Sequence, residues 1–132
     1  MTEAITGGCM CGALTYRADA GPINVRVCHC TICQRATGTS FFARILVPLE
    51  AVQISGPVHW YNSSTELARG FCARCGSTLF SKRESHGVIG LGFGSLDNPN
   101  DFDPEEHIWV SEQQKWLHFA DEVPTHAGPA PS

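Results

Sequence analysis

The chain has 132 residues, a net charge of −4 and 42% hydrophobic residues. This length fits one domain with a buried core, and the hydrophobic content excludes a disordered chain. The nine lysines and arginines are scattered, which excludes the clustered basic face of a nucleic-acid-binding protein. No apolar run reaches the ~20 residues of a membrane-spanning helix, so we expect no membrane partner.

Short β-type runs separated by glycine and proline predict a mainly β single domain. We expect a polar lead over residues 1–6 and a helical turn over residues 31–36, with Thr31 as its N-cap. The predicted strands cover residues 13–17, 23–27, 41–47, 52–55, 58–61, 78–81, 88–93 and 107–110. Glycines in the segment 87–94 indicate a close backbone approach or a bulge.

The C-terminal part is less regular. The segment 113–119 is expected to close the sheet. Residues 124–132 are rich in proline, glycine and alanine, and we expect them to form a disordered tail beyond a domain that covers residues 1–123.

Seven cysteines are the most unusual feature of the composition. The first eight residues have neither the basic nor the apolar region of a secretory signal, so we expect a cytoplasmic protein. Disulfides are rare in that reducing compartment. The cysteine count is odd and several cysteines are too close to pair with one another, so metal binding is the favoured use.

Three of the thiols, Cys28, Cys30 and Cys33, lie within one short stretch. The spacing permits two groupings of the seven. Cys30, Cys33, Cys72 and Cys75 could form one four-cysteine site. Alternatively, Cys9, Cys11, Cys72 and Cys75 could form a closed structural zinc site, which leaves Cys28, Cys30 and Cys33 as a three-thiol site with an open fourth position. The second grouping is favoured because it uses every thiol.

The order of these motifs resembles the glutathione-dependent formaldehyde-activating enzymes, a family that includes centromere protein V-like proteins. The resemblance covers roughly residues 7 to 120. Four segments carry it: Gly8-Cys9-Met10-Cys11-Gly12, Cys28-His29-Cys30-Thr31-Ile32-Cys33-Gln34, Phe71-Cys72-Ala73-Arg74-Cys75-Gly76-Ser77, and Gly94-Ser95-Leu96-Asp97 with His107-Ile108-Trp109 and Trp116 behind it.

The resemblance implies an Mss4-like, β-rich fold built around a structural zinc, and it implies the second grouping. Two Zn²⁺ ions per chain are then expected: a structural ion on Cys9, Cys11, Cys72 and Cys75, and a catalytic ion on Cys28, Cys30 and Cys33. The implied activity is that of a carbon–sulfur lyase. It would add a thiol such as glutathione to formaldehyde or a related small aldehyde.

The substrate contacts are left open by the sequence. Gln34, Arg35 and Thr37 are the candidate binding residues beside the catalytic cysteines. A carboxylate of glutathione could be held by Arg35, Arg26 or Arg44, and the sequence does not choose among these three.

Two other functions remain open at this point. The protein could be a non-catalytic zinc module that binds a partner through an exposed patch of Phe41, Phe42 and Phe93. It could also be a thiol redox or metal-storage protein that uses Cys28, Cys30 and Cys33. His29 is expected to point away from the metal, because side chains alternate along an extended chain. His107 is expected to make a structural hydrogen bond.

Overall fold

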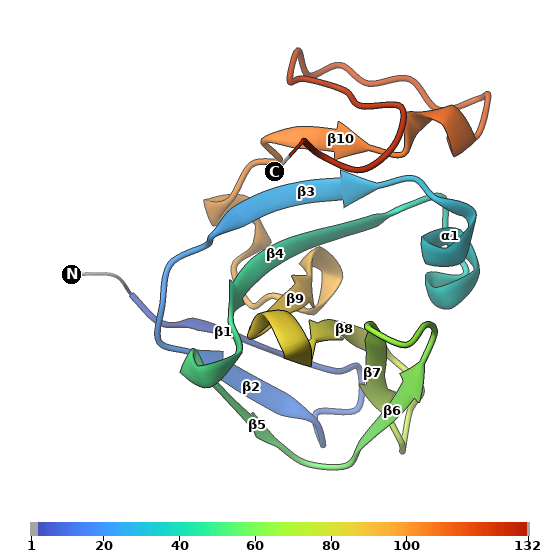
Figure 1. Cartoon of the computed structure of the whole chain (residues 1–132). Helices are drawn as coiled ribbons and strands as arrows, with labels where there is room; N and C mark the ends of the chain where they lie inside the picture. The colour runs from blue at the N-terminus through green and yellow to red at the C-terminus, as the bar shows by residue number, and fades with distance from the viewer. Residues whose placement is uncertain (1–2, 132) are drawn as a thin grey trace.

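A computed structural model of the protein describes residues 3–131 (Figure 1). Over these residues it contains one α-helix, α1 (Thr31–Thr37), and short 3₁₀ turns that include η5 (Val110–Glu112). The strands are β1 (Ile5–Gly8), β2 (Thr15–Ala18), β3 (Asn24–Cys28), β4 (Phe42–Pro48), β5 (Val52–Ser55), β6 (Val58–Asn62), β7 (Ala68–Cys72), β8 (Thr78–Arg83), β9 (Val88–Gly92) and β10 (Glu106–Ile108). The predicted mainly β fold is confirmed.

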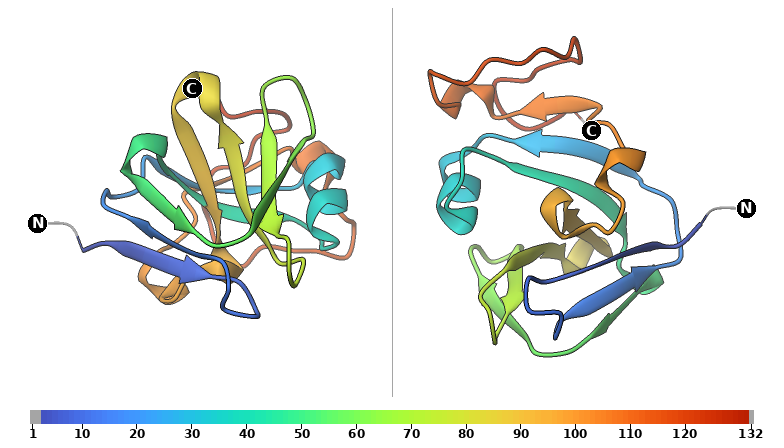
Figure 2. Two further views of the ribbon diagram at one scale, coloured as in Figure 1. Left: turned by 90° about the horizontal axis from the view of Figure 1, so that it is seen from below. Right: turned by 180° about the vertical axis from the view of Figure 1, so that it is seen from behind.

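The strands form two sheets. The smaller sheet has the order β1-β2-β5, and the larger sheet has the order β10-β3-β4-β9-β8-β7-β6. Figures 1 and 2 show the small sheet lying against the curved large sheet. The core between them contains Leu14 and Tyr16 from the small-sheet region, with Ile45, Phe80 and Leu91 from the large sheet. Burial of these apolar side chains supplies the main driving force for folding.

Alternation along β3 sets the direction of Cys28. Val25 and Val27 are buried, whereas Asn24, Arg26 and Cys28 point to the opposite face of the large sheet. In the neighbouring strand β4, Ile45 and Val47 are fully buried, and Phe42 and Arg44 stand opposite Cys28 and Arg26. The hydrophobic pattern of two strands therefore sends a cysteine and two arginines to one face.

Helix α1 begins at Thr31, where the predicted helical turn begins, but its N-cap differs from the prediction. Its N-cap is Cys30, whose sulfur accepts a hydrogen bond from the backbone N–H of Cys33, and not Thr31. The hydroxyl and the N–H of Thr31 instead donate to the Glu112 carboxylate. The helix ends at Thr37, and its C-cap Gly38 adopts the left-handed conformation with φ 68°. A cysteine at the N-cap ties the helix start to the cysteine cluster.

Three expectations at the chain ends differ from the structure. Residues 5 and 6 of the expected polar lead belong to β1, and residues 113–119 form no strand. Residues 124–131 are no free tail either. The His107 N–H donates to Pro124 O at 3.0 Å, the His126 N–H donates to His107 O at 2.9 Å, and the Trp109 N–H donates to Gly128 O at 3.0 Å. The free edge of β10 needs backbone partners, and this segment supplies them.

Within residues 3–131, no helix has the length and apolar content required to cross a membrane. The single α-helix has seven residues.

Candidate metal centres and catalytic site

Four sulfurs meet at one end of the molecule. Cys9 and Cys11 follow β1, Cys72 ends β7, and Cys75 lies in the following turn; their Sγ atoms are all within 4.8 Å of one another. The Cys9–Cys11 and Cys11–Cys72 sulfur distances are 3.6 Å and 3.8 Å. A tetrahedral zinc with Zn–S bonds of about 2.3 Å separates its sulfurs by roughly 3.8 Å, so the residues fit a structural zinc. We call these residues the four-sulfur cluster.

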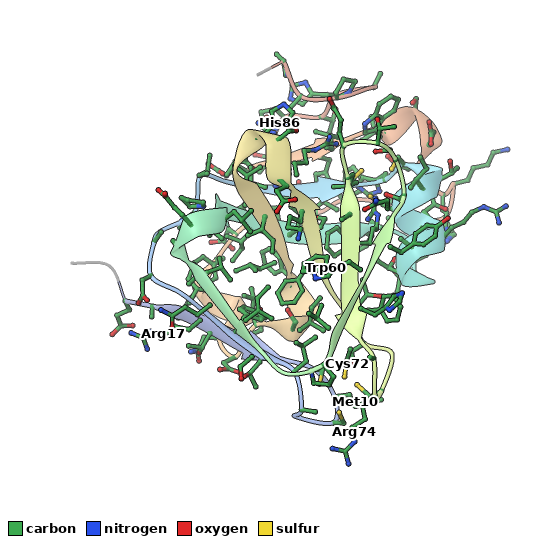
Figure 3. All side chains as sticks on the ribbon, turned by 60° about the horizontal axis from the view of Figure 1, so that its bottom comes forward. Met10, Arg17, Trp60, Cys72, Arg74 and His86 are labelled. Atoms are coloured by element: carbon green, nitrogen blue, oxygen red, sulfur yellow. The ribbon has the colours of Figure 1, made fainter. Side chains whose placement is uncertain are left out.

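Backbone amides surround the four-sulfur cluster. The N–H groups of Arg74 and Cys75 donate to the Cys72 sulfur at 3.4 Å, and the Leu14 N–H donates to the Cys9 sulfur at 3.3 Å. Hydrogen bonds from Ser77 lower the pKa of Cys75 to about 5, which favours the metal-binding thiolate. The side chain of Arg74 extends away from the sulfurs in Figure 3, so this residue contributes its amide and not its charge.

Gly12 and Gly76 close the two cysteine turns. Both adopt φ 80°, a backbone conformation that other residues rarely take. The Gly76 N–H donates to the Cys72 carbonyl and not to a sulfur. The glycine therefore permits the turn, while the two residues before it supply the N–H···S bonds.

The other three sulfurs form a separate group. Cys28 ends β3, Cys30 caps α1, and Cys33 lies in the first turn of α1. The Cys28–Cys30 sulfur distance is 3.4 Å, and all three sulfurs lie within 4.8 Å of one another. Among the described residues, no fourth histidine, cysteine or carboxylate joins this group. We call these three residues the three-sulfur cup; their spacing fits three zinc ligands with one open position.

The positions of the sulfurs decide which of the two cysteine pairings that the sequence permitted is formed. Cys72 and Cys75 lie with Cys9 and Cys11, and not with Cys30 and Cys33. The favoured division into four and three sulfurs is therefore the one that the fold assembles.

A buried arginine that the sequence analysis missed contacts the three-sulfur cup. Arg69 of β7 is 7% exposed, and its Nη2 donates to the Cys33 sulfur at 3.5 Å. Hydrogen bonds with Cys28 and Cys33 lower the pKa of Cys30 far below its ordinary value, and the Arg69 charge adds to this effect. Three thiolates around Zn²⁺ carry a net charge of −1, which Arg69 balances. The sequence around Arg69 does not indicate this contact. Arg69 and Cys33 are far apart along the chain, and only the curvature of the large sheet brings β7 to α1.

His29 turns away from the cup, as the alternation predicted. It is fully buried, and its Nε2 lies 2.9 Å from Nδ1 of His107. His107 Nε2 in turn lies 2.9 Å from the carboxylate of Asp121, and the His107 ring stacks on Phe119 at 3.7 Å. If Asp121 accepts the Nε2 proton of His107, then His107 Nδ1 accepts from His29. His29 Nδ1 has no partner among the described residues. The chain of contacts joins β3 to the segment after β10.

The candidate substrate residues on α1 have different surroundings. The amide of Gln34 donates to the carbonyls of His29 and Glu112, and the Thr37 hydroxyl donates to the Cys33 carbonyl. Both side chains thus hold the backbone around the cup. Arg35 is exposed and lines a shallow hollow with Thr31, Gln34, Thr39 and Gln114.

The phenylalanine patch proposed for an interaction module does not form. Phe42 is 7% exposed and Phe93 packs against the hydrophobic core, while Phe41 is 36% exposed. Phe42 is buried because it faces Gly92 of β9 across the large sheet.

The fold and the sulfur groups define a mainly β protein with two cysteine-based sites suited to metal. A model of the family "Glutathione-dependent formaldehyde-activating enzyme" matches residues 4–112. The chain belongs to this family.

Two known proteins are similar to the chain. A Schizosaccharomyces pombe protein named as an uncharacterized lyase is 31% identical over 74 residues, which are 56% of this chain. The match spans about half of that protein, 54% of its length. A crystal structure of a Rhodobacter sphaeroides protein has the same fold, with a TM-score of 0.59, 22% identity, and coverage of 91% of this chain and 98% of the other.

Proposed function

We propose that the protein is a zinc-dependent carbon–sulfur lyase that adds a thiol such as glutathione to formaldehyde or a related small aldehyde. The observation that carries the proposal is the three-sulfur cup, which offers three ligands on one side and has no fourth protein ligand among the described residues. Membership of the family and the name of the yeast relative as a lyase support the reaction class.

A zinc ion in the cup would supply a cation beside which a thiol ionises at neutral pH. The protein's own residues define the setting. Cys28, Cys30 and Cys33 hold the ligand sulfurs on a rigid strand end and a capped helix turn. Arg69 donates to Cys33 and offsets the negative charge of the thiolates, so that this charge does not oppose the approach of another thiol.

The proposed reaction balances without an oxidant or reductant. The substrate sulfur forms a bond to the aldehyde carbon, the π pair of the carbonyl moves to oxygen, and oxygen takes the proton that the thiol released. The reverse reaction breaks the same carbon–sulfur bond. The proposal needs two Zn²⁺ ions per chain, one in each sulfur group, and the cup ion is the exchangeable one.

The reaction can be followed with glutathione and ¹³C-formaldehyde by exchange NMR. The adduct also forms without a catalyst, so the rate of interconversion is the quantity to measure, not the yield. The wild-type protein is expected to accelerate interconversion, and Cys33→Ser is expected to return the rate to that of buffer while the far-ultraviolet circular dichroism is kept. Ser85→Ala, at an exposed turn far from the cysteines in sequence, is the matched control. A Cys33→Ser variant as fast as the wild type would refute the proposal.

A further inference from the structure

Arg44 lies on the face of the large sheet to which Cys28 also points. It lies on β4 opposite Arg26 of β3, and two residues before it Phe42 lies opposite Cys28. Its side chain crosses β9 at Gly90, where an added Cβ would lie 2.9 Å from Arg44 Cδ. The lack of a side chain at Gly90 therefore gives the arginine stem its room on the sheet.

The side chain of Arg44 is half-buried and has no anionic partner among residues 3–131. Its Nη1 donates to the neutral side-chain oxygen of Asn24. Burial, and then the neighbouring Arg26, lower the pKa of Arg44 to about 10, which leaves it charged at neutral pH, while Cys28 and Cys33 of the cup act in the opposite direction. A charge in this position is costly unless it is paired.

The other N–H groups of Arg44 remain available. The described residues offer them no hydrogen-bond partner, and none of these nitrogens is sealed from solvent. A guanidinium presents five N–H donors in a planar fork that matches a carboxylate. Arg44 can therefore accept an anion from outside the protein without giving up Asn24.

The two alternatives that the sequence offered for the same role are placed differently. Arg26 already pairs with Glu106 of β10. Arg35 is exposed on α1 beside the hollow that includes Thr31 and Gln114. A half-buried cation with no counter-ion among the described residues is better suited to select an anion than either of these.

We propose that Arg44 binds a carboxylate of the thiol whose sulfur enters the three-sulfur cup, so that the site selects anionic peptide thiols over neutral ones. Phe42 lies opposite Cys28, and Arg44 follows two residues later on the same strand, which corresponds to roughly 7 Å along the strand. A carboxylate one peptide unit away from a cysteine sulfur, as in glutathione, can span such a distance. This inference rests on the proposed function for the presence of a thiol in the cup.

The test uses S-methylglutathione, which keeps both carboxylates but has no thiol to ionise. Its binding to the zinc-loaded protein is measured by titration calorimetry. Arg44→Gln is expected to weaken binding by about tenfold or more, because a charge-assisted hydrogen bond is lost. Arg44→Lys is expected to restore part of the affinity. Arg17→Gln removes an equal charge from the small sheet and is expected to leave binding unchanged.

The diethyl ester of the same probe completes a double-mutant cycle. The ester is expected to bind the wild type more weakly than the acid, and Arg44→Gln is expected to cost the ester nothing further. Equal affinity of the acid for wild type and Arg44→Gln would overturn the inference. The inference would also be overturned if Arg35→Gln weakened binding of the acid and Arg44→Gln did not. A wild-type protein that does not bind the probe would overturn it as well.

The binding test is separate from catalysis. If glutathione and formaldehyde show no acceleration but Arg44→Gln still weakens the S-methylated probe, then the proposed reaction fails and the anion site stands. If catalysis is seen but the probe binds the variant unchanged, then the anion site fails and the reaction stands.

Discussion

The two sulfur groups are built from the same residue type in different ways. The four-sulfur cluster gathers its ligands from segments that are far apart in sequence, and three backbone N–H groups donate to its sulfurs. The three-sulfur cup takes its ligands from one local stretch and has a buried arginine from a distant strand beside it. Neutral amides suit a closed site that joins parts of the fold. Three protein ligands and a nearby cation suit the open site that the proposed reaction requires.

The largest expected effect separates the two groups by their contribution to stability. Cys72→Ser should remove metal from the four-sulfur cluster and unfold the domain, since a structural zinc contributes ~10–16 kcal/mol, as much as the ~5–15 kcal/mol that stabilises a whole domain. Thermal unfolding and metal content measure this. Cys33→Ser is the comparison, and it should lower metal content without unfolding. Similar melting curves for both variants would contradict the distinction.

The next effect tests the charge beside the cup. Arg69→Gln is expected to weaken metal binding at the cup by about 10- to 100-fold, because outer contacts to ligands contribute on this scale. With Co²⁺ in the exchangeable site, loss of the hydrogen bond to Cys33 should shift the sulfur-to-cobalt charge-transfer band to longer wavelength.

Arg69→Lys is the matched variant for that test, since it keeps the charge and should recover part of the affinity. An unchanged cobalt spectrum in Arg69→Gln would reduce Arg69 to a packing residue and remove one of the differences between the two sulfur groups.

A smaller effect is expected behind the cup. His107→Ala removes the contacts to His29 and Asp121 and the stacking on Phe119, and should destabilise the protein by about 2–3 kcal/mol. Amide exchange should become faster in residues 124–131, which pair with the backbone at His107. Asp121→Asn keeps an acceptor oxygen and should cost less. Metal content of the cup is expected to stay unchanged in His107→Ala. Loss of that metal would contradict the view that the cup is held by its local ligands alone.

The smallest expected effect concerns acid stability at the same edge. Burial alone would raise the pKa of Glu106, but hydrogen bonds from Arg26 and His126 lower it below its ordinary value of 4.5. Because the pKa of Glu106 is lower in the folded state, the unfolded chain takes up this proton first as the pH falls. The stabilisation that Glu106 provides is therefore fully present above pH 4.5 and is lost as the pH falls further. Glu106→Gln should therefore flatten the acid limb of the stability curve, by at most about 1 kcal/mol. Identical acid limbs would contradict this assignment.

The sequence by itself determined the local features of this protein. Alternation along the chain predicts that His29 points away from the cup, and the short spacing of Cys28, Cys30 and Cys33 predicts a cluster, because both depend on neighbouring residues alone. The mainly β class and most strands follow from the same local patterns. The cysteine order also carried the family resemblance, which the match over residues 4–112 confirms.

Only the tertiary structure decided what depends on distant strands. Cys72 could have joined either cysteine group, and the packing of the two sheets places it with Cys9 and Cys11. The curvature of the large sheet brings Arg69 to Cys33. The pairing of β4 with β3 and β9 places Arg44 beside Asn24 and Gly90, with no anionic partner in the part of the chain that the structure describes. The free edge of β10 draws in residues 124–131, whose composition indicated a tail. Such contacts depend on the order of the strands and on which side chains are buried, and the spacing of residues along the chain does not reveal either.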